Sequence, residues 1–172
     1  IEIIFVNDGS TDLSLDLIQK YIAETKDKKF NIKIISYEKN QGKGNAIKQG
    51  VLSASNQWIL TMDIDLSVSL NQINEWFKNE FITNEDVAYF GSRLLDKSQV
   101  KAKKYRSLVG DVFNFLLKHI MNNKLLFIKD TQCGFKLYNS SFSNLIFSNM
   151  NEKGYIHDVE ILILIIKNKI KV

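Results

Sequence analysis

The sequence predicts an α/β protein built on a mostly parallel sheet with helices on both faces. Short apolar runs of strand length alternate along the chain with stretches whose apolar residues recur every three or four positions. This is the pattern of strands alternating with amphipathic helices. The apolar run at residues 58–66 ends in two carboxylates, as expected of a central parallel strand that is buried on both faces.

The elements of the first half follow from local patterns. Residues 1–6 are a β-branched run and predict a strand; the polar turn at 7–12 then leads into a helix to about residue 25, with Ser10 or Thr11 as its N-cap. Further strands are expected at 32–36, 58–66 and 87–91, and further helices at 45–54 and through 70–77.

The second half has a different character. Residues 93–106 are polar and basic, and an amphipathic helix is expected at 108–121. Residues 130–138 read as a loop that runs into a strand, after which Ser140 or Ser141 is expected to cap a short helix. Residues 159–167 are apolar nearly all round and predict a buried helix.

Asp63 and Asp65 stand where the apolar run ends, spaced i, i+2. Residues at this spacing point to the same side of a strand, so the carboxylates converge if the strand persists and both line a loop if it has just ended. Close carboxylates repel unless a cation or hydrogen-bond donors lie between them, and oxygen ligands suit Mg²⁺ or Mn²⁺. The alternative is that one of them simply caps the following helix.

The composition favours a globular protein with an anionic partner. The chain has 172 residues, 45% of them hydrophobic and 24% charged, which fits one domain over residues 1–172. The net charge of +4 favours an anionic ligand or membrane surface and does not require nucleic acid. The one cysteine, Cys133, excludes an internal disulfide and fits a reducing compartment. The chain begins and ends inside apolar runs, so we expect it to be cut from a longer protein.

Several other residues are candidates for a site, each with a plainer alternative. Gly42-Lys43-Gly44 lacks the spacing of a phosphate loop, but glycines at a helix N-terminus suit an anion; a plain turn is the alternative. His157 and Asp158 are either an acid–base pair or caps of the last helix. Glu160 lies one turn into that buried helix and needs a partner there, for which Lys136 or Arg93 are available.

Six short motifs follow one another along the chain. They are Asn7-Asp8-Gly9-Ser10-Thr11-Asp12, Asn40-Gln41-Gly42-Lys43-Gly44-Asn45-Ala46, the Asp63/Asp65 pair, Gly91-Ser92-Arg93, the segment 130–136 and Asp158-Val159-Glu160. In this order they resemble the family-2 glycosyltransferases, and the last three resemble the branch of dolichyl-phosphate glucosyltransferases and other polyprenyl-phosphate glycosyltransferases. The resemblance implies the GT-A fold of nucleotide-diphospho-sugar transferases, with its Rossmann-like sheet. The family's first strand would lie before Ile1.

The resemblance also implies roles for the candidate residues. It assigns Asp8 to the uridine of a nucleotide sugar, and Asp63 and Asp65 to the ribose and the metal–diphosphate region. Asp65 is the expected ligand of Mg²⁺ or Mn²⁺, with Asp63 beside it toward the ribose or the ion, and Lys43 is expected near phosphate. A further ligand in relatives falls here on Ser67, a poorer ligand, so a water is expected to substitute.

The reaction implied is inverting transfer of a hexose, with glucose favoured, from a UDP-sugar to a polyprenyl phosphate. A phosphate monoester has a second pKa of about 6, so this acceptor is mostly dianionic at neutral pH and needs cations rather than a base. Arg93 and Arg106 are expected to hold that phosphate, because arginine forks match phosphate oxygens. The lysines between them favour a membrane surface, and we expect a cytoplasmic protein or one on the cytoplasmic face of a membrane.

Two other functions fit the same residues. One is a glycan-extending transferase with a sugar-hydroxyl acceptor, whose proton Asp158 would take as a general base. The other is a non-catalytic module that binds a nucleotide or a metal ion. Transfer to an oligosaccharide would favour the first alternative, and the absence of UDP-sugar hydrolysis would favour the second.

Overall fold

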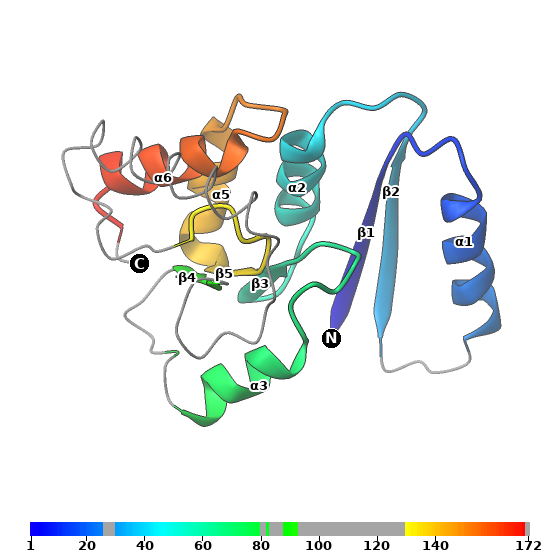
Figure 1. Ribbon diagram of the computed structural model, residues 1–172, viewed down its shortest axis with the longest axis horizontal. Coiled ribbons are helices and arrows are strands. Elements are labelled where there is room, and N and C mark those ends of the chain that lie inside the picture. Colours follow the sequence, from blue (N-terminus) through cyan, green and yellow to red (C-terminus); the bar gives the residue numbers. More distant parts are fainter. Residues whose placement is uncertain (26–29, 80–81, 83–87, 93–129, 171–172) are drawn as a thin grey trace, which may run out of the picture. The chain divides into compact units, whose positions relative to one another are not determined.

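The computed structural model describes residues 1–25, 30–79, 82, 88–92 and 130–170 (Figure 1). In chain order its elements are β1 (Glu2–Asp8), α1 (Ser14–Glu24), β2 (Asn31–Tyr37), α2 (Lys43–Leu52), β3 (Trp58–Thr61), α3 (Asn71–Lys78), β4 (Ala88–Phe90), β5 (Lys136–Asn139), α5 (Ser140–Asn149) and α6 (His157–Lys167). The alternation of strands and helices expected from the sequence is confirmed. The expected basic segment and the helix at 108–121 lie outside the described residues.

The described strands are hydrogen-bonded into two sheets. β1 and β2 pair in parallel, in a register that runs from Glu2 opposite Asn31 to Asp8 opposite Tyr37. The other sheet has the strand order β3-β5-β4. The sequence predicted one mostly parallel sheet. Among the described residues the pair β1–β2 is parallel, and the single Rossmann-like sheet stays a prediction.

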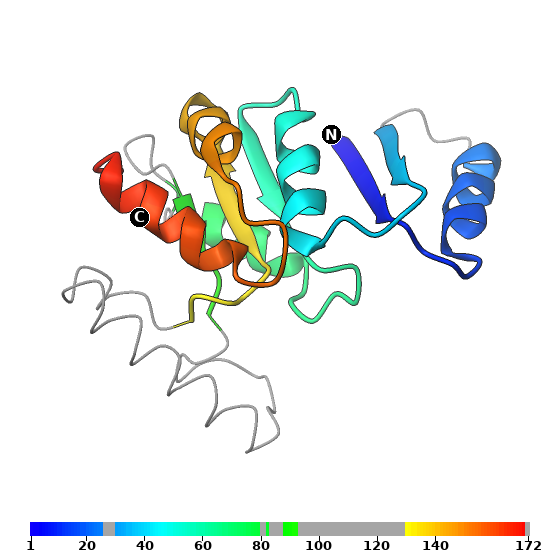
Figure 2. The same cartoon turned by 90° about the horizontal axis from the view of Figure 1, so that it is seen from above.

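The chain forms two compact units, Ile1–Ile59 with Tyr138–Asn168 and Leu60–Leu137 with Lys169–Val172. In the first unit, α2 is the central element: it contacts β1 and also α5 and α6 (Figure 2). The buried apolar side chains of this unit come from these helices, from β3 and β5, and from the residue after α5: Val51, Ile59, Tyr138, Phe142, Ile146, Phe147, Met150, Ile161, Leu162 and Ile165. Tyr138 and Phe147 meet edge to face, with ring centroids 5.2 Å apart.

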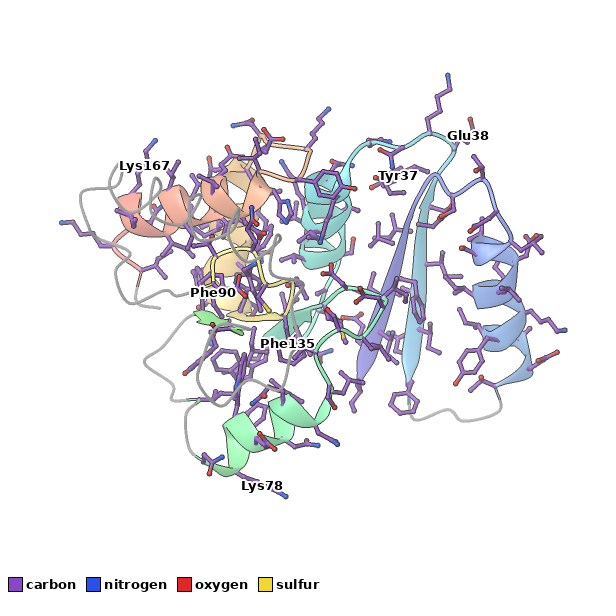
Figure 3. All side chains as sticks on the ribbon, viewed as in Figure 1. Tyr37, Glu38, Lys78, Phe90, Phe135 and Lys167 are labelled. Carbon is purple, nitrogen blue, oxygen red and sulfur yellow. The ribbon has the colours of Figure 1, made fainter. Side chains whose placement is uncertain are left out.

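The second unit has a smaller core around the start of β5. Cys133, Phe135 and Leu137 are buried there, together with Ala88 of β4. Trp76 of α3 lies edge-on against Phe135, at a centroid distance of 5.4 Å. Phe135 and Phe90 of this unit are labelled in Figure 3. Across the part of the chain that the structure describes, no helix is long and apolar enough to cross a membrane.

The helix starts differ from those predicted. α1 begins at Ser14 instead of after Ser10 or Thr11, because β1 continues to Asp8 and the backbone N–H of Ser14 is taken by Asp12 Oδ1 at 3.0 Å. The predicted caps of α5, Ser140 and Ser141, are wrong by one or two positions. Its N-cap is Asn139, whose side-chain oxygen accepts the Ser141 N–H at 2.9 Å. In the turn before α1, the Asp12 side chain thus competes with the helix for a backbone donor, the Ser14 N–H.

Glu2 ties the start of β1 to β2 and to the chain that follows α2. Its carboxylate accepts a hydrogen bond from Lys33 Nζ at 2.6 Å and from the Ser55 N–H at 2.9 Å. The bond from Lys33, and then the one from Ser55, hold the pKa of the Glu2 carboxyl below its ordinary value of 4.5.

This depressed pKa predicts a stability contribution that depends on pH. Because the folded state favours the ionised form, the contribution is fully present above about pH 4.5 and is lost as the pH falls through the lower folded-state pKa. We expect Glu2→Gln to lower the free energy of unfolding at pH 7 by at most about 1 kcal/mol. Urea titration at pH 7 and pH 3 measures this, with Glu24→Gln on exposed α1 as the control. An equal loss at both pH values would contradict the prediction.

Candidate functional site

The first group of predicted site residues lies at the N-terminal end of α2, in the first unit. The carboxylate of Asp8 accepts two backbone N–H groups of the loop before α2, that of Gln41 at 2.7 Å and that of Gly42 at 2.8 Å. The Asn40 side chain also donates to the Asp8 carbonyl oxygen at 3.1 Å. Asp8 is the last residue of β1 and its carboxylate holds this loop, whereas the sequence had placed it in the polar turn at 7–12 that leads into a helix.

The glycines at the start of α2 are required by close backbone packing. Gly42 has a φ of +104°, and a Cβ there would collide with the Lys153 carbonyl oxygen. The N–H groups of Gly44 and Asn45 donate to the carbonyl oxygens of Gly154 and Lys153, each at 3.2 Å. These two donors of the first helical turn are thus used within the protein, which favours the turn alternative over a phosphate loop.

Lys43 is the first residue of α2 and is half-buried. Its predicted contact with a phosphate depends on the ammonium group, since the neighbouring N–H groups are engaged with carbonyl oxygens. The assignment of Lys43 to phosphate stays a prediction.

The loop that packs on α2 is itself held by Glu160 of α6. The Glu160 carboxylate accepts the Asn151 N–H at 2.9 Å and the Glu152 N–H at 2.6 Å. Glu160 is half-buried, and backbone donors, rather than the predicted Lys136, are the partners of its carboxylate. Lys136 is 2% exposed, and its ammonium donates to the Cys133 carbonyl oxygen at 2.5 Å.

His157 and Asp158 form a buried pair at the start of α6. Nδ1 of His157 lies 2.8 Å from the Gly154 carbonyl oxygen and Nε2 lies 3.3 Å from Asp158 Oδ1. A carbonyl oxygen only accepts, so Nδ1 donates to it, while Nε2 faces the Asp158 carboxyl group. The residues are the first two of α6 and not its N-cap, which is Ile156. The role of Asp158 as a base stays a prediction.

The second group of predicted site residues lies in the second unit, in the loop after β3. β3 ends at Thr61, so Asp63 and Asp65 line a loop, which is the second of the two arrangements that the sequence left open. Asp63 is half-buried and Asp65 is exposed, and Asp65 Oδ1 accepts the Ser67 N–H at 2.9 Å. Neither caps α3, whose N-cap is Leu70.

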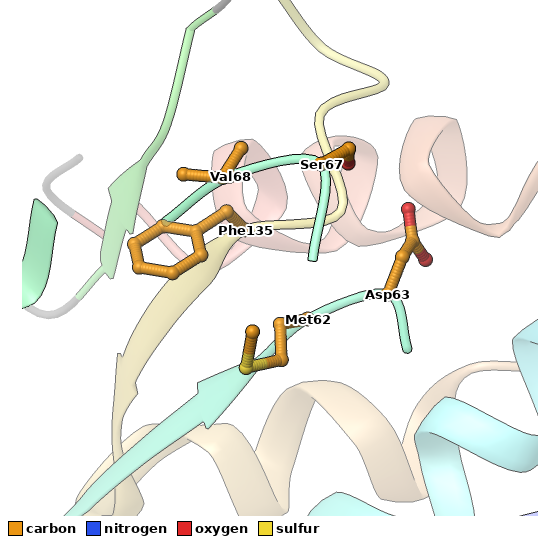
Figure 4. Close-up of a pocket in the computed structure, with 5 residues that line it drawn as sticks. All are labelled: Met62, Asp63, Ser67, Val68 and Phe135. Carbon is orange, nitrogen blue, oxygen red and sulfur yellow. The ribbon is translucent and has the colours of Figure 1, made fainter. Parts of the chain in front are cut away.

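A small pocket opens beside this loop (Figure 4). Its lining residues are Met62, Asp63, Ser67, Val68 and Phe135. On its β5 side the backbone of Gly134 approaches the Asp63 carboxylate so closely that a Cβ at Gly134 would lie 2.5 Å from Oδ2. The pocket thus joins the loop after β3 to the residues that lead into β5.

The oxygen donors of the loop fit a hard divalent cation. Among the described residues no group of three or more His, Cys, Asp and Glu side chains is placed to hold a metal ion. Mg²⁺ commonly takes only one or two protein carboxylates and completes its shell with water and substrate phosphates. A carboxylate offers about four lone-pair sites, so the bond from Ser67 leaves Asp65 able to act as such a ligand.

Sequence reasoning identified these carboxylates but missed the residues that hold them. The N–H groups of Gln41 and Gly42 were not expected to bind Asp8, and Gly134 was part of a motif without a role of its own. The only indication of the Gly134 contact in the sequence was the glycine itself. A single sequence does not show which neighbouring group lies where a glycine lacks a side chain. Arg93 and Arg106, the predicted acceptor residues, lie outside the described residues.

Strand-end carboxylates on an alternating α/β framework define a class of ligand-binding α/β domains. The model of the family described as Glycosyl transferase family 2 matches residues 1–145. The chain therefore belongs to glycosyltransferase family 2, as its motifs predicted.

The chain is also similar in sequence to curated proteins. The chain is 33% identical to a dolichyl-phosphate beta-glucosyltransferase of Trichomonas vaginalis, over 99% of this chain and 52% of that protein. It is 32% identical to the Homo sapiens dolichyl-phosphate beta-glucosyltransferase, over 94% of this chain and 50% of that protein, and 30% identical to the Saccharomyces cerevisiae enzyme of the same name, over 99% and 54%. The chain thus spans about half the length of the curated relatives it matches.

The bonds to Asp8 predict that it controls the order of the loop before α2. Asp8→Ala removes both acceptors, and hydrogen bonds to a charged group contribute about 1.5–3 kcal/mol each. We expect the amide hydrogens of Gln41 and Gly42 to exchange at least about tenfold faster in this variant. Hydrogen exchange followed by NMR measures it, and Asp16→Ala on exposed α1 is the control. Unchanged exchange at Gln41 and Gly42 would show that other contacts order the loop.

Proposed function

We propose that this chain is the catalytic domain of an inverting, metal-dependent glycosyltransferase that moves a hexose, with glucose favoured, from a UDP-sugar to a polyprenyl phosphate. The observation that carries the proposal is the alignment of nearly the whole chain with relatives named dolichyl-phosphate beta-glucosyltransferase. Dolichyl and undecaprenyl phosphate share the chemistry that the site would recognise, a phosphate monoester on a long apolar chain.

The nucleotide part of the donor is proposed to bind near the end of β1. Each oxygen of the Asp8 carboxylate accepts one backbone N–H and keeps a second lone pair. A uracil ring carries an imide N–H that such an oxygen can accept. The two bonds from the loop hold the carboxylate in one orientation, which lowers the entropy cost of binding. Lys43, one residue beyond that loop, adds a positive charge for phosphate.

The diphosphate is proposed to lie at the loop after β3, where Asp65 and Asp63 would hold Mg²⁺ or Mn²⁺. A divalent ion bound there would neutralise charge on the departing diphosphate. Asp65 is suited to direct ligation because it is exposed, and its bond from the Ser67 N–H fixes the side chain. Asp63 is less exposed and is suited to hold the ribose or to support the ion.

The acceptor decides whether a base is needed. A lipid phosphate is already ionised and attacks the anomeric carbon without losing a proton, whereas a sugar hydroxyl must give up its proton to a positioned base. Asp158 is 8% exposed and is engaged by His157, which does not favour the sugar-hydroxyl alternative. A lipid phosphate acceptor implies work at a membrane surface.

A donor screen on the full-length protein tests the proposal. Purified protein is incubated with Mn²⁺ or Mg²⁺, a short polyprenyl phosphate and each of several UDP-hexoses, and glycolipid formation is measured. We expect transfer with UDP-glucose. Transfer only to an oligosaccharide would favour the glycan-extending alternative, and neither transfer nor donor hydrolysis would favour a non-catalytic binding module.

The paired carboxylates predict a graded loss of donor binding. We expect Asp65→Ala to weaken metal-dependent UDP binding by more than about 100-fold and Asp63→Ala by about tenfold, because the first removes a ligand and the second a supporting group. Calorimetric titration with UDP in the presence of Mn²⁺ measures both. Asp16→Ala is the control. Wild-type affinity in Asp65→Ala would contradict the assignment of Asp65 as a metal ligand.

The two arginines predict a separate effect on the acceptor. We expect Arg93→Ala or Arg106→Ala to raise the KM for polyprenyl phosphate by about tenfold or more while UDP affinity stays unchanged, since each removes a charge-assisted hydrogen bond. Lys103→Ala, in the same basic segment, should mainly reduce liposome binding, and that loss should shrink at high salt. Wild-type transfer rates in both arginine variants would place the acceptor site elsewhere.

A further inference from the structure

Gly134 lies with its backbone against the carboxylate of Asp63. The atoms nearest to a Cβ built on Gly134 all belong to that carboxyl group: Oδ2 at 2.5 Å, Cγ at 2.8 Å and Oδ1 at 2.9 Å. Gly134 does not need to be glycine for its backbone angles, because among the described glycines only Gly9 and Gly42 have a positive φ. The space taken by the Asp63 carboxylate is therefore what excludes a side chain at this position.

The backbone around Gly134 is held in place from several sides. The Thr61 hydroxyl lies 3.2 Å from the Gly134 carbonyl oxygen, which ties it to the end of β3. The next carbonyl oxygen, that of Phe135, accepts the Gly91 N–H at 2.9 Å. The Phe135 ring is buried and lies edge-on against Trp76. A Cβ at Gly134 would therefore have to displace the Asp63 carboxyl group rather than the backbone.

Lys136 also holds the segment Cys133–Lys136, from its C-terminal end. Its ammonium donates to the Cys133 carbonyl oxygen and lies 5.4 Å from the centre of the Phe90 ring. A buried ammonium is costly unless it is paired, so these contacts hold the Lys136 side chain, which reaches from the start of β5 back to the Cys133 carbonyl oxygen. Gly134 lies between these two residues in the chain.

We propose that Gly134 is a positioning residue for Asp63, and that the backbone from Cys133 to Lys136 is a rigid wall that sets where the Asp63 carboxylate points. The inference rests on the proposed function, in which that carboxylate supports the metal ion or the ribose of the donor. A displacement of about 1 Å in such a group can cost up to about 100-fold in rate, so a wall that restricts its rotamers contributes to donor binding without touching the donor.

Gly134→Ala is the informative substitution. The added methyl group is compatible with the backbone and conflicts first with the carboxyl group, which is the far end of a side chain with two rotatable bonds. The fold should therefore tolerate the change by rotating Asp63 away. We expect metal-dependent UDP binding to weaken about as much as in Asp63→Ala, by about tenfold, while Tm falls by no more than about 4 °C.

A double-mutant cycle in the full chain shows whether the effect passes through Asp63. Wild type, Gly134→Ala, Asp63→Ala and the double variant are titrated with UDP at saturating Mn²⁺, and then with Mn²⁺ at fixed UDP. In the absence of the carboxylate the methyl group has room, so the double variant should bind UDP as Asp63→Ala does. Gly50→Ala is the matched control: the one heavy atom that its Cβ approaches is Val6 Cγ2, at 3.2 Å, and we expect wild-type affinity.

The outcomes separate this inference from the proposed function. Wild-type affinity in Gly134→Ala together with a loss in Asp63→Ala overturns the positioning role alone. A double variant that binds UDP more weakly than Asp63→Ala also overturns it, because Gly134→Ala would then act by another route. Wild-type affinity in Asp63→Ala overturns the assignment of that carboxylate to the donor site and, with it, the role of Gly134.

Discussion

The backbone N–H groups at the start of α2 are the constraint on which the first unit depends. A helix leaves its first N–H groups without partners inside the helix, and when that end is buried they must be bonded elsewhere. Here the Asp8 carboxylate takes the N–H groups of the preceding loop, and two carbonyl oxygens of the loop before α6 take those of Gly44 and Asn45. Segments more than 100 residues apart in the sequence are joined in this way, because Gly44 donates to Gly154.

A second constraint, of space rather than of bonding, operates in the second unit. The residues that lead into β5 pass so close to the loop after β3 that a methyl group at Gly134 would collide with the Asp63 carboxylate in its observed position. Glycine therefore has two different uses in this protein. Gly42 combines a left-handed backbone with a close carbonyl oxygen, whereas Gly134 has ordinary backbone angles and is restricted only by the neighbouring carboxylate.

Charged side chains in both units form hydrogen bonds to backbone groups. Glu160 accepts N–H groups of the loop before α6, and Lys136 donates to the Cys133 carbonyl oxygen. Throughout the described residues, every buried side-chain nitrogen or oxygen has a hydrogen-bond partner. These hydrogen bonds hold the loops next to the predicted site residues in place.

The sequence by itself determined the alternation of strands and helices and the carboxylates after β3, because apolar periodicity and strand-end chemistry are local properties that a single chain displays. Its motifs also determined the family. It did not determine that β1 reaches Asp8, that Asn139 rather than a serine caps α5, or that Glu160 binds backbone N–H groups. The partners of Asp8 and of Gly134 were likewise decided only by the tertiary structure. They lie more than 30 residues away along the chain, and neither hydrogen bonds nor excluded space between such distant segments leave a periodic trace in the sequence.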